Sequence, residues 1–307
     1  MPNKLVIAGI CLLAAGLETA GAGSPISLDV LRRDGYGSVH LVNTDGNQLY
    51  VPVEIDGKKF KLALDSGFGG DGFAIGGAAR DLHLTPTKNL KSALVQTMPG
   101  TRRLIQPQMV QSVVIGNVQI HDVPVYAFEG FGASLGRGFL HVNNAVLDLA
   151  NLTLYLRPPR TGKPVDLSHA LTVVGMGEAP LSVGDGGACV VSVEVNNVPT
   201  KLLLHTGAQV TVLDDRFADQ AKLRGWGRKN QEWIDVTGFH KTIDFAGPRS
   251  FKIGGIPLRT STLTLTTLPM YSETGGRIAG VLGLDILGSN RGVIDFAQNK
   301  LYFAKAK

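Results

Sequence analysis

The sequence predicts an all-β protein built from two similar lobes, and three observations support this prediction. Short stretches rich in β-branched residues alternate with Asp-Gly and Gly-Gly turn signals, which is the pattern of strands joined by tight turns. Landmarks of the first half recur in the second half in the same order and at a nearly constant spacing. Helical signal is scarce, because only residues 214–223 and, more weakly, residues 75–84 show a helical pattern. We therefore expect two β lobes with one short helix each.

The chain begins with a segment typical of a secretory signal peptide. Lys4 gives a positive start, residues 5–17 form an apolar stretch too short to span a bilayer, and residues 20–22 resemble a cleavage site. We expect residues 1–22 to be removed and the mature protein to be periplasmic or secreted. No later stretch is long and apolar enough for an integral membrane span.

The composition favours a globular protein with a large core over other classes. Apolar residues make up 44% of the chain, which is enough to form such a core. The net charge of +5 is mild and no long Lys/Arg run occurs, so we do not expect nucleic-acid binding. Removal of the signal peptide would leave Cys189 alone, without a disulfide partner. The histidines lack metal-ligand spacing and no phosphate or dinucleotide motif occurs, so we expect no metal and no cofactor.

The strongest repeat aligns residues 51–67, VPVEIDGKKFKLALDSG, with residues 191–207, VSVEVNNVPTKLLLHTG, without a gap. Later landmarks follow in the same order: VVIGNV at 113–118 with FKIGGI at 251–256, and LGRGFLHVNNAVLDLANLTLYL at 135–156 with LGLDILGSNRGVIDFAQNKLYF at 282–303. Such a series of matches predicts an internal duplication of one lobe.

The repeat and the composition between its copies define the expected domains. We expect an N-terminal lobe over residues 24–160 and a C-terminal lobe over residues 178–307. Residues 161–177 lie in a stretch with prolines, a glycine and charged residues, so we expect a linker there.

The repeated motif resembles the lobe of retropepsin-like and pepsin-like aspartic peptidases. In that family a hydrophobic strand leads into Asp-Ser/Thr-Gly, and a hydrophobic-Leu-Gly segment followed by a strand comes later in the same lobe. The resemblance covers nearly the whole expected mature chain. The sequence is similar to bacterial members of the family that have two lobes fused in one chain. It implies two β-barrel lobes with a cleft for a protein or peptide substrate between them.

The resemblance also assigns site residues. Six residues fall on the two catalytic loops of the family: Asp65, Ser66, Gly67, His205, Thr206 and Gly207. In the family, two aspartates share a proton, one activating a water and the other donating to the scissile carbonyl. Here His205 stands in place of the second aspartate, and Phe68 stands where a small residue is usual. Gly100 and Gly238 fall where the tips of two substrate-covering flaps would be.

The chemistry of Asp65 and His205 leaves three hypotheses open. Asp65 could activate a water while a cationic His205 stabilises the developing charge or donates a proton, which would make the protein a secreted or periplasmic aspartic-type peptidase. Alternatively, the protein is an inactive pseudopeptidase that binds extended peptides in the same cleft by strand addition. In a third hypothesis, two copies pair their Asp65 lobes as a dimer, but the fused second lobe favours a monomer.

Overall fold

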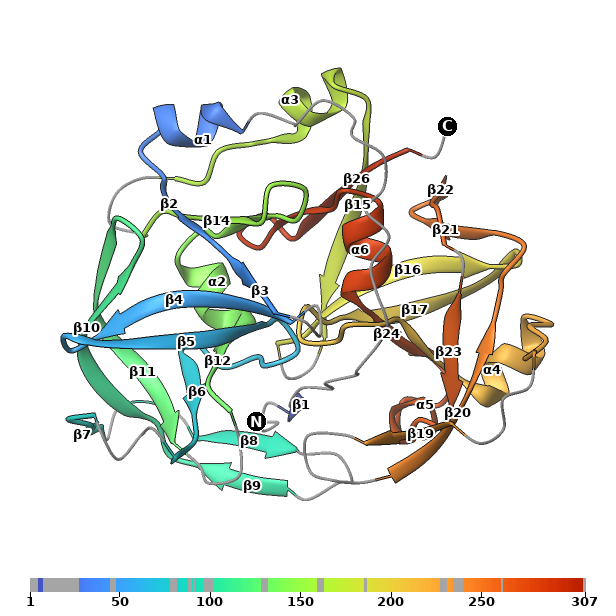
Figure 1. The fold of residues 1–307 in the computed structure, drawn as a ribbon, viewed down its shortest axis with the longest axis horizontal. Coiled ribbons are helices and arrows are strands. Elements are labelled where there is room, and N and C mark those ends of the chain that lie inside the picture. Colours follow the sequence, from blue (N-terminus) through green and yellow to red (C-terminus); the bar gives the residue numbers. More distant parts are fainter. Residues whose placement is uncertain are drawn as a thin grey trace.

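The computed structural model describes most of the 307-residue chain, namely residues 5–7, 28–44, 48–77, 82–87, 90, 92–96, 102–127, 132–158, 163–184, 187–226, 231–234, 240–260 and 262–305. Two β lobes lie side by side and are joined by a sheet to which both contribute (Figure 1). No helix in this described part is long and apolar enough to cross a membrane.

The first lobe is a twisted sheet that closes on itself, because β4 pairs with both β5 and β10. Its strands, in sequence order, are β3 (Val42–Asn43), β4 (Leu49–Ile55), β5 (Lys58–Asp65), β6 (Phe73–Ile75), β7 (Thr85–Pro86), β10 (Gln108–Ile115), β11 (Val118–Ala127) and β12 (Ser134–Gly136). Alternate residues of β4 point into the lobe, since Leu49, Val51, Val53 and Ile55 are all buried. This alternation is the property that the sequence pattern predicted.

The second lobe repeats this arrangement around the strand pair β16 and β17. Its strands are β15 (Met176–Val183), β16 (Cys189–Val195), β17 (Val198–Leu204), β18 (Val212–Asp214), β19 (Gln231–Ile234), β20 (His240–Ala246), β21 (Phe251–Ile253), β22 (Ile256–Pro257), β23 (Leu263–Thr266) and β24 (Gly280–Leu282). In each lobe, the strand that leads into the loop at Asp65 or His205 runs parallel to the strand with the Leu-Gly pair. These parallel pairs are β5–β12 and β17–β24.

A sheet contributed by both lobes holds the molecule together. It runs in the order β15-β26-β25-β13-β14-β2, and its remaining strands are β2 (Gly37–His40), β13 (Val146–Asp148), β14 (Thr153–Leu156), β25 (Val293–Asp295) and β26 (Lys300–Ala304). The two lobes meet where β13 pairs antiparallel with β25, with Leu147 opposite Ile294. Both side chains are fully buried in a core cluster that includes residues of both lobes. The lobes are therefore joined by backbone pairing and by a continuous core.

The helices are short, and the structure has more of them than the sequence predicted. They are α1 (Asp29–Arg33), α2 (Arg137–Val142), α3 (Ser168–Val173), α4 (Asp215–Gln220), α5 (Pro269–Glu273) and α6 (Leu284–Ser289). The predicted helix at 214–223 is present as α4, whose first turn is capped by the Asp214 carboxylate. Part of the weaker candidate at 75–84 lies outside the described residues. The other helices span five or six residues each, which is too short for a helical period to show in the sequence.

The described part of the expected linker at residues 161–177 includes regular secondary structure. It contains α3 and the first residues of β15. In chain order α3 precedes β15 as α1 precedes β2, and both helices lie along the same edge of the molecule in Figure 1. The second half of the chain thus repeats the helix–strand order that begins the first half.

Two hairpins are present in the segments where the flaps were predicted, one in each lobe. β8 (Ala93–Gln96) pairs antiparallel with β9 (Arg102–Ile105), and β19 pairs antiparallel with β20. Gly100 and Gly238 belong to the connections inside these two hairpins and lie outside the described residues. A short strand β1 (Leu5–Ile7) pairs in parallel with β8. It falls within the predicted signal peptide, whose removal stays a prediction.

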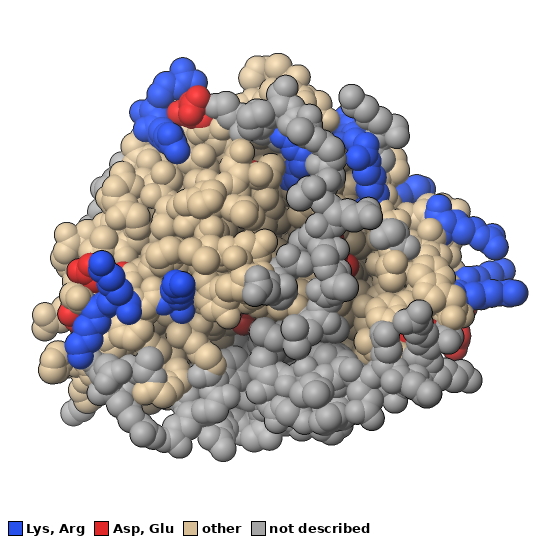
Figure 2. Space-filling view, in the orientation of Figure 1, with Lys and Arg blue, Asp and Glu red and all other residues tan. Residues whose placement is uncertain are grey.

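Surface charge is distributed in small groups. On the face shown in Figure 2, Lys and Arg side chains lie in several separate places and form no continuous basic area among the described residues.

Candidate active site

Each site loop begins where a central strand ends. Asp65 is the last residue of β5, and His205 directly follows β17. Behind the first loop β12 places Gly136 beside Asp65 in parallel register, and an added Cβ there would lie 2.7 Å from the Phe68 carbonyl oxygen. At Gly283 an added Cβ would lie 2.5 Å from the Val210 carbonyl oxygen. A Leu-Gly segment thus passes closely behind each loop, because both glycines stand where no side chain fits.

Four buried hydrogen bonds tie the two loops together across the lobe interface. The Ser66 N–H donates to Thr206 Oγ1 at 2.9 Å, and the Thr206 N–H donates to Ser66 Oγ at 2.9 Å. The two hydroxyls then donate to backbone of the opposite strand, Ser66 to the Leu204 carbonyl at 3.0 Å and Thr206 to the Leu64 carbonyl at 2.9 Å. Each hydroxyl thus acts as donor and acceptor at once, which fixes both loops in one relative position.

Asp65 and His205 meet at this junction, as their places in the repeat predicted. His205 Nδ1 lies 3.2 Å from Asp65 Oδ1. Each of the two atoms also receives a backbone N–H from its own loop: Gly67 donates to Asp65 Oδ1 at 2.9 Å, and Gly207 donates to His205 Nδ1 at 3.2 Å. The imidazole nitrogen therefore occupies a place equivalent to that of a carboxylate oxygen in the other loop.

The contact between Oδ1 and Nδ1 is a hydrogen bond only in a state with a proton between the two atoms. A carboxylate oxygen and an unprotonated ring nitrogen are both acceptors, and two acceptors 3.2 Å apart repel each other unless a proton lies between them. With that proton present, the pair forms a charge-assisted or neutral hydrogen bond in a buried setting, where such bonds are strong. A ring nitrogen that donates to Oδ1 cannot also accept from the Gly207 N–H, so the two contacts of Nδ1 exclude each other at any one moment.

The side chains of Asp65 and His205 are both buried. The His205 side chain is 0% exposed and that of Asp65 is 5% exposed. His205 Nε2 is buried without a hydrogen-bond partner among the described residues, and Gly67 lies against the ring, where an added Cβ would be 2.6 Å from Nε2. Both side chains are therefore buried at the lobe junction, and Gly67 lies against Nε2. A direct role of His205 toward substrate stays a prediction.

Phe68, the departure from the family pattern in the first loop, is accommodated inside the lobe. Its ring is 1% exposed and packs edge-on against Tyr126, with ring centroids 5.6 Å apart. Gly136 and Gly70 leave room for this ring, since a Cβ on either would lie within 2.7 Å of it. The corresponding residue in the second loop is the buried Ala208. Phe68 therefore fills space behind Asp65 and leaves the Asp65–His205 contact intact.

Arg137 is a buried residue beside the site that the sequence did not single out. Its backbone N–H donates to the Phe68 carbonyl oxygen at 2.7 Å, and its guanidinium reaches across to the second lobe, where Nη2 donates to Asn299 Oδ1 at 2.8 Å. The repeat held a signal for it, because the matching landmarks place Leu284 of the second lobe opposite Arg137. A buried arginine where the other lobe has leucine marks a role specific to the first lobe.

Among the residues that the structure describes, no group of three or more His, Cys, Asp or Glu side chains is arranged to hold a metal ion. The carboxylate and imidazole at the junction are only two ligands, fewer than zinc sites supply.

Comparison with known proteins gives the class to which this fold and site correspond. Residues 191–286 match the family described as aspartyl protease, a range that includes the second loop with His205 and does not extend to Asp65. A crystal structure of an aspartic proteinase from Irpex lacteus aligns with 89% of this chain and 98% of that chain, with a TM-score of 0.56 and 14% sequence identity. No curated protein matches the chain in sequence.

These findings confirm the predicted resemblance to aspartic peptidases and the all-β fold with two lobes. The family match and the fold together support a protease-type function.

Proposed function

We propose that this protein is an aspartic-type peptidase in which Asp65 is the reacting carboxylate and His205, in place of a second aspartate, is its internal partner. The observation that carries the proposal is the 3.2 Å contact between Asp65 Oδ1 and His205 Nδ1 at a junction locked by four hydrogen bonds between the loops. A loop that had lost its role would not need to hold a polar pair buried between the lobes.

The geometry assigns separate tasks to the two oxygens of Asp65. Oδ1 is engaged by the Gly67 N–H and by His205, so Oδ2 is the oxygen left for a water. In the proposed reaction Oδ2 accepts a proton from that water while the water oxygen attacks the peptide carbonyl carbon. Asp65 Oδ2 then gives this proton to the amine nitrogen, which leaves as the C–N bond breaks. His205 keeps this carboxylate oriented through the contact between Nδ1 and Oδ1.

The surroundings suit an extended peptide as substrate. The β8–β9 and β19–β20 pairs are antiparallel hairpins, and strands of this kind can pair with an extended chain. We further propose that the protein acts in the periplasm or after secretion, on the strength of its predicted signal peptide, and that one chain suffices because it supplies both loops.

One observation favours the alternative, a pseudopeptidase that binds peptides without cleaving them. The His205 side chain is 0% exposed, so its ring does not stand beside Asp65 as a second accessible reacting group. Two accessible carboxylates normally divide the roles of base and acid, so a single group must perform both in turn.

Cleavage of an unfolded protein mixture distinguishes the two functions. Purified protein should cleave the mixture between about pH 3 and 8, Asp65→Asn should reduce the rate by about 10² or more, and the exposed Asp219→Asn should leave it unchanged. Absence of cleavage by the wild type, together with peptide binding that Asp65→Asn does not abolish, would establish the binding function instead.

A further inference from the structure

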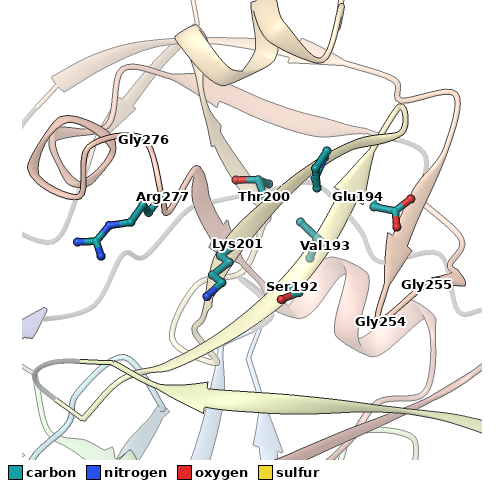
Figure 3. Close-up of a pocket in the computed structure, with 10 residues that line it drawn as sticks. Ser192, Val193, Glu194, Thr200, Lys201, Gly254, Gly255, Gly276 and Arg277 are labelled. Atoms are coloured by element: carbon teal, nitrogen blue, oxygen red, sulfur yellow. The ribbon is translucent and has the colours of Figure 1, made fainter.

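An open pocket lies on the second lobe, away from the Asp65–His205 junction. It has a volume of about 440 Å³ and is formed by β16, β17, the turn between β21 and β22, and the loop between α5 and β24 (Figure 3). Lys201 lines it and precedes His205 on the same chain segment by four residues, about 13 Å along an extended strand. Neither site loop contributes to its lining.

The pocket exists because the partner of β16 changes there. β15 pairs with β16 up to Val191, and β21 pairs with it from Val193, so the two partner strands diverge at Ser192. Gly254 and Gly255, which form the turn after β21, have φ values of 55° and 78° and leave this place without side chains. The depression is therefore built into the strand arrangement.

Its charges are divided between two ends. Figure 3 shows Arg277 toward one end and Glu194 toward the other, with Lys201 between them. Glu194 is neutralised by Lys252, whose Nζ lies 3.1 Å from its carboxylate. The two basic side chains have no such partner, since neither Lys201 nor Arg277 forms an ion pair within the described part of the chain.

One hydrogen bond within its own loop orients the Arg277 side chain. Its Nε donates to the Thr274 carbonyl oxygen at 2.9 Å, so this side chain is oriented by its own loop. The N–H groups on the two terminal nitrogens of its guanidinium can donate to both oxygens of a carboxylate. The Lys201 ammonium adds a second positive charge. Two cations without an ion-pair partner in the described part of the chain match the requirements of a carboxylate.

We propose that this pocket binds a carboxylate side chain of an acidic polypeptide segment. The pocket is open along one side, so an extended chain can enter and leave it, and the paired Glu194 at the far end offers no attraction for a second acidic group. The inference does not depend on the proposed peptidase activity, because none of the lining residues belongs to the site loops.

Exposed ion pairs are weak and are screened by salt, so binding is expected at low ionic strength and should decline as salt is added. The probe is a fluorescein-labelled hexaglutamate peptide, with hexaglutamine as the uncharged reference, and the measurement is fluorescence anisotropy of the full-length protein.

A matched pair of variants separates the pocket from general surface charge. Lys201→Glu with Arg277→Glu changes the net charge as much as Lys59→Glu with Lys61→Glu does on the first lobe. Lys61 faces Pro52 across β4 and β5 as Lys201 faces Ser192 across β16 and β17. All four substituted side chains are exposed, so both variants should fold.

The pocket variant should bind hexaglutamate about tenfold more weakly than the wild type, and the first-lobe variant should lose much less. Asp65→Asn should bind as the wild type does, whether or not the proposed function is correct. Equal weakening by the two double variants would overturn the proposal. Displacement of the peptide by an equal concentration of free glutarate would overturn the assignment to a polypeptide in favour of a small dicarboxylate.

Discussion

Gly67 is the position at which the unusual histidine can be tested through stability. The Gly67→Ala substitution adds one methyl group beside the fully buried His205 ring. The three atoms nearest to the added Cβ all belong to His205, namely Nε2 at 2.6 Å, Cε1 at 2.7 Å and Cδ2 at 2.8 Å. These separations are about 1 Å shorter than an ordinary carbon–carbon contact.

Overpacking of this kind in a buried site costs about 1–3 kcal/mol, so we expect Gly67→Ala to lower the free energy of unfolding by that amount. The cost should depend on the ring. In a His205→Ala background the atoms that would clash are gone, so the same substitution should cost less than about 1 kcal/mol, giving a coupling energy of about 1–2 kcal/mol.

Urea unfolding of the two single variants, the double variant and the wild type measures this coupling. Gly77→Ala is the control, because nothing lies within 4 Å of a Cβ built at that exposed glycine, and it should change stability by less than about 0.5 kcal/mol. A Gly67→Ala cost that is equally large with and without His205 would show that the ring does not lie against Gly67.

Two further predictions concern the loop junction and the shared sheet. Thr206→Val removes a hydroxyl that accepts from the Ser66 N–H and donates to the Leu64 carbonyl, so two buried groups lose their partner and stability should fall by about 2–4 kcal/mol. Thr206→Ser keeps both bonds and should cost less than half as much in the same unfolding assay. Burial raises the pKa of Asp295 to about 6, so the folded protein binds this proton more tightly than the unfolded chain, and stability should fall as pH rises from about 4 to 6 and then level off. Asp295→Asn should remove about 3 kcal/mol of that fall, and superimposable stability–pH curves would contradict the assignment.

The site loops could be predicted from the sequence because their geometry is encoded locally. A strand of alternating burial ends at Asp65, and the glycine two residues later supplies the N–H for its carboxylate. The same arrangement recurs at His205, so the repeat alone placed the two side chains opposite each other. The strands that flank Gly100 and Gly238 also follow from short-range pattern, since hairpin pairing connects neighbouring segments.

Features that depend on contacts between distant segments could not be predicted. The burial of His205 follows from the close approach of Gly67, which lies on the other lobe. The pairing of β13 with β25 joins segments far apart in the chain, and neither short strand indicates its partner. The role of Arg137 depends on Asn299, which is 162 residues away. In each case the sequence pattern sets the local conformation, and tertiary packing decides which surfaces meet.

The central claim is that Asp65 works with a buried His205 in place of a second aspartate, and a pH–rate profile of peptide cleavage by the wild type and His205→Asp tests it most directly. The account predicts an active wild type, and a His205→Asp variant whose optimum lies at lower pH, because two carboxylates share a proton only under acidic conditions. An inactive wild type alongside an active His205→Asp variant would contradict the account and identify the native protein as a peptide-binding relative of the peptidases.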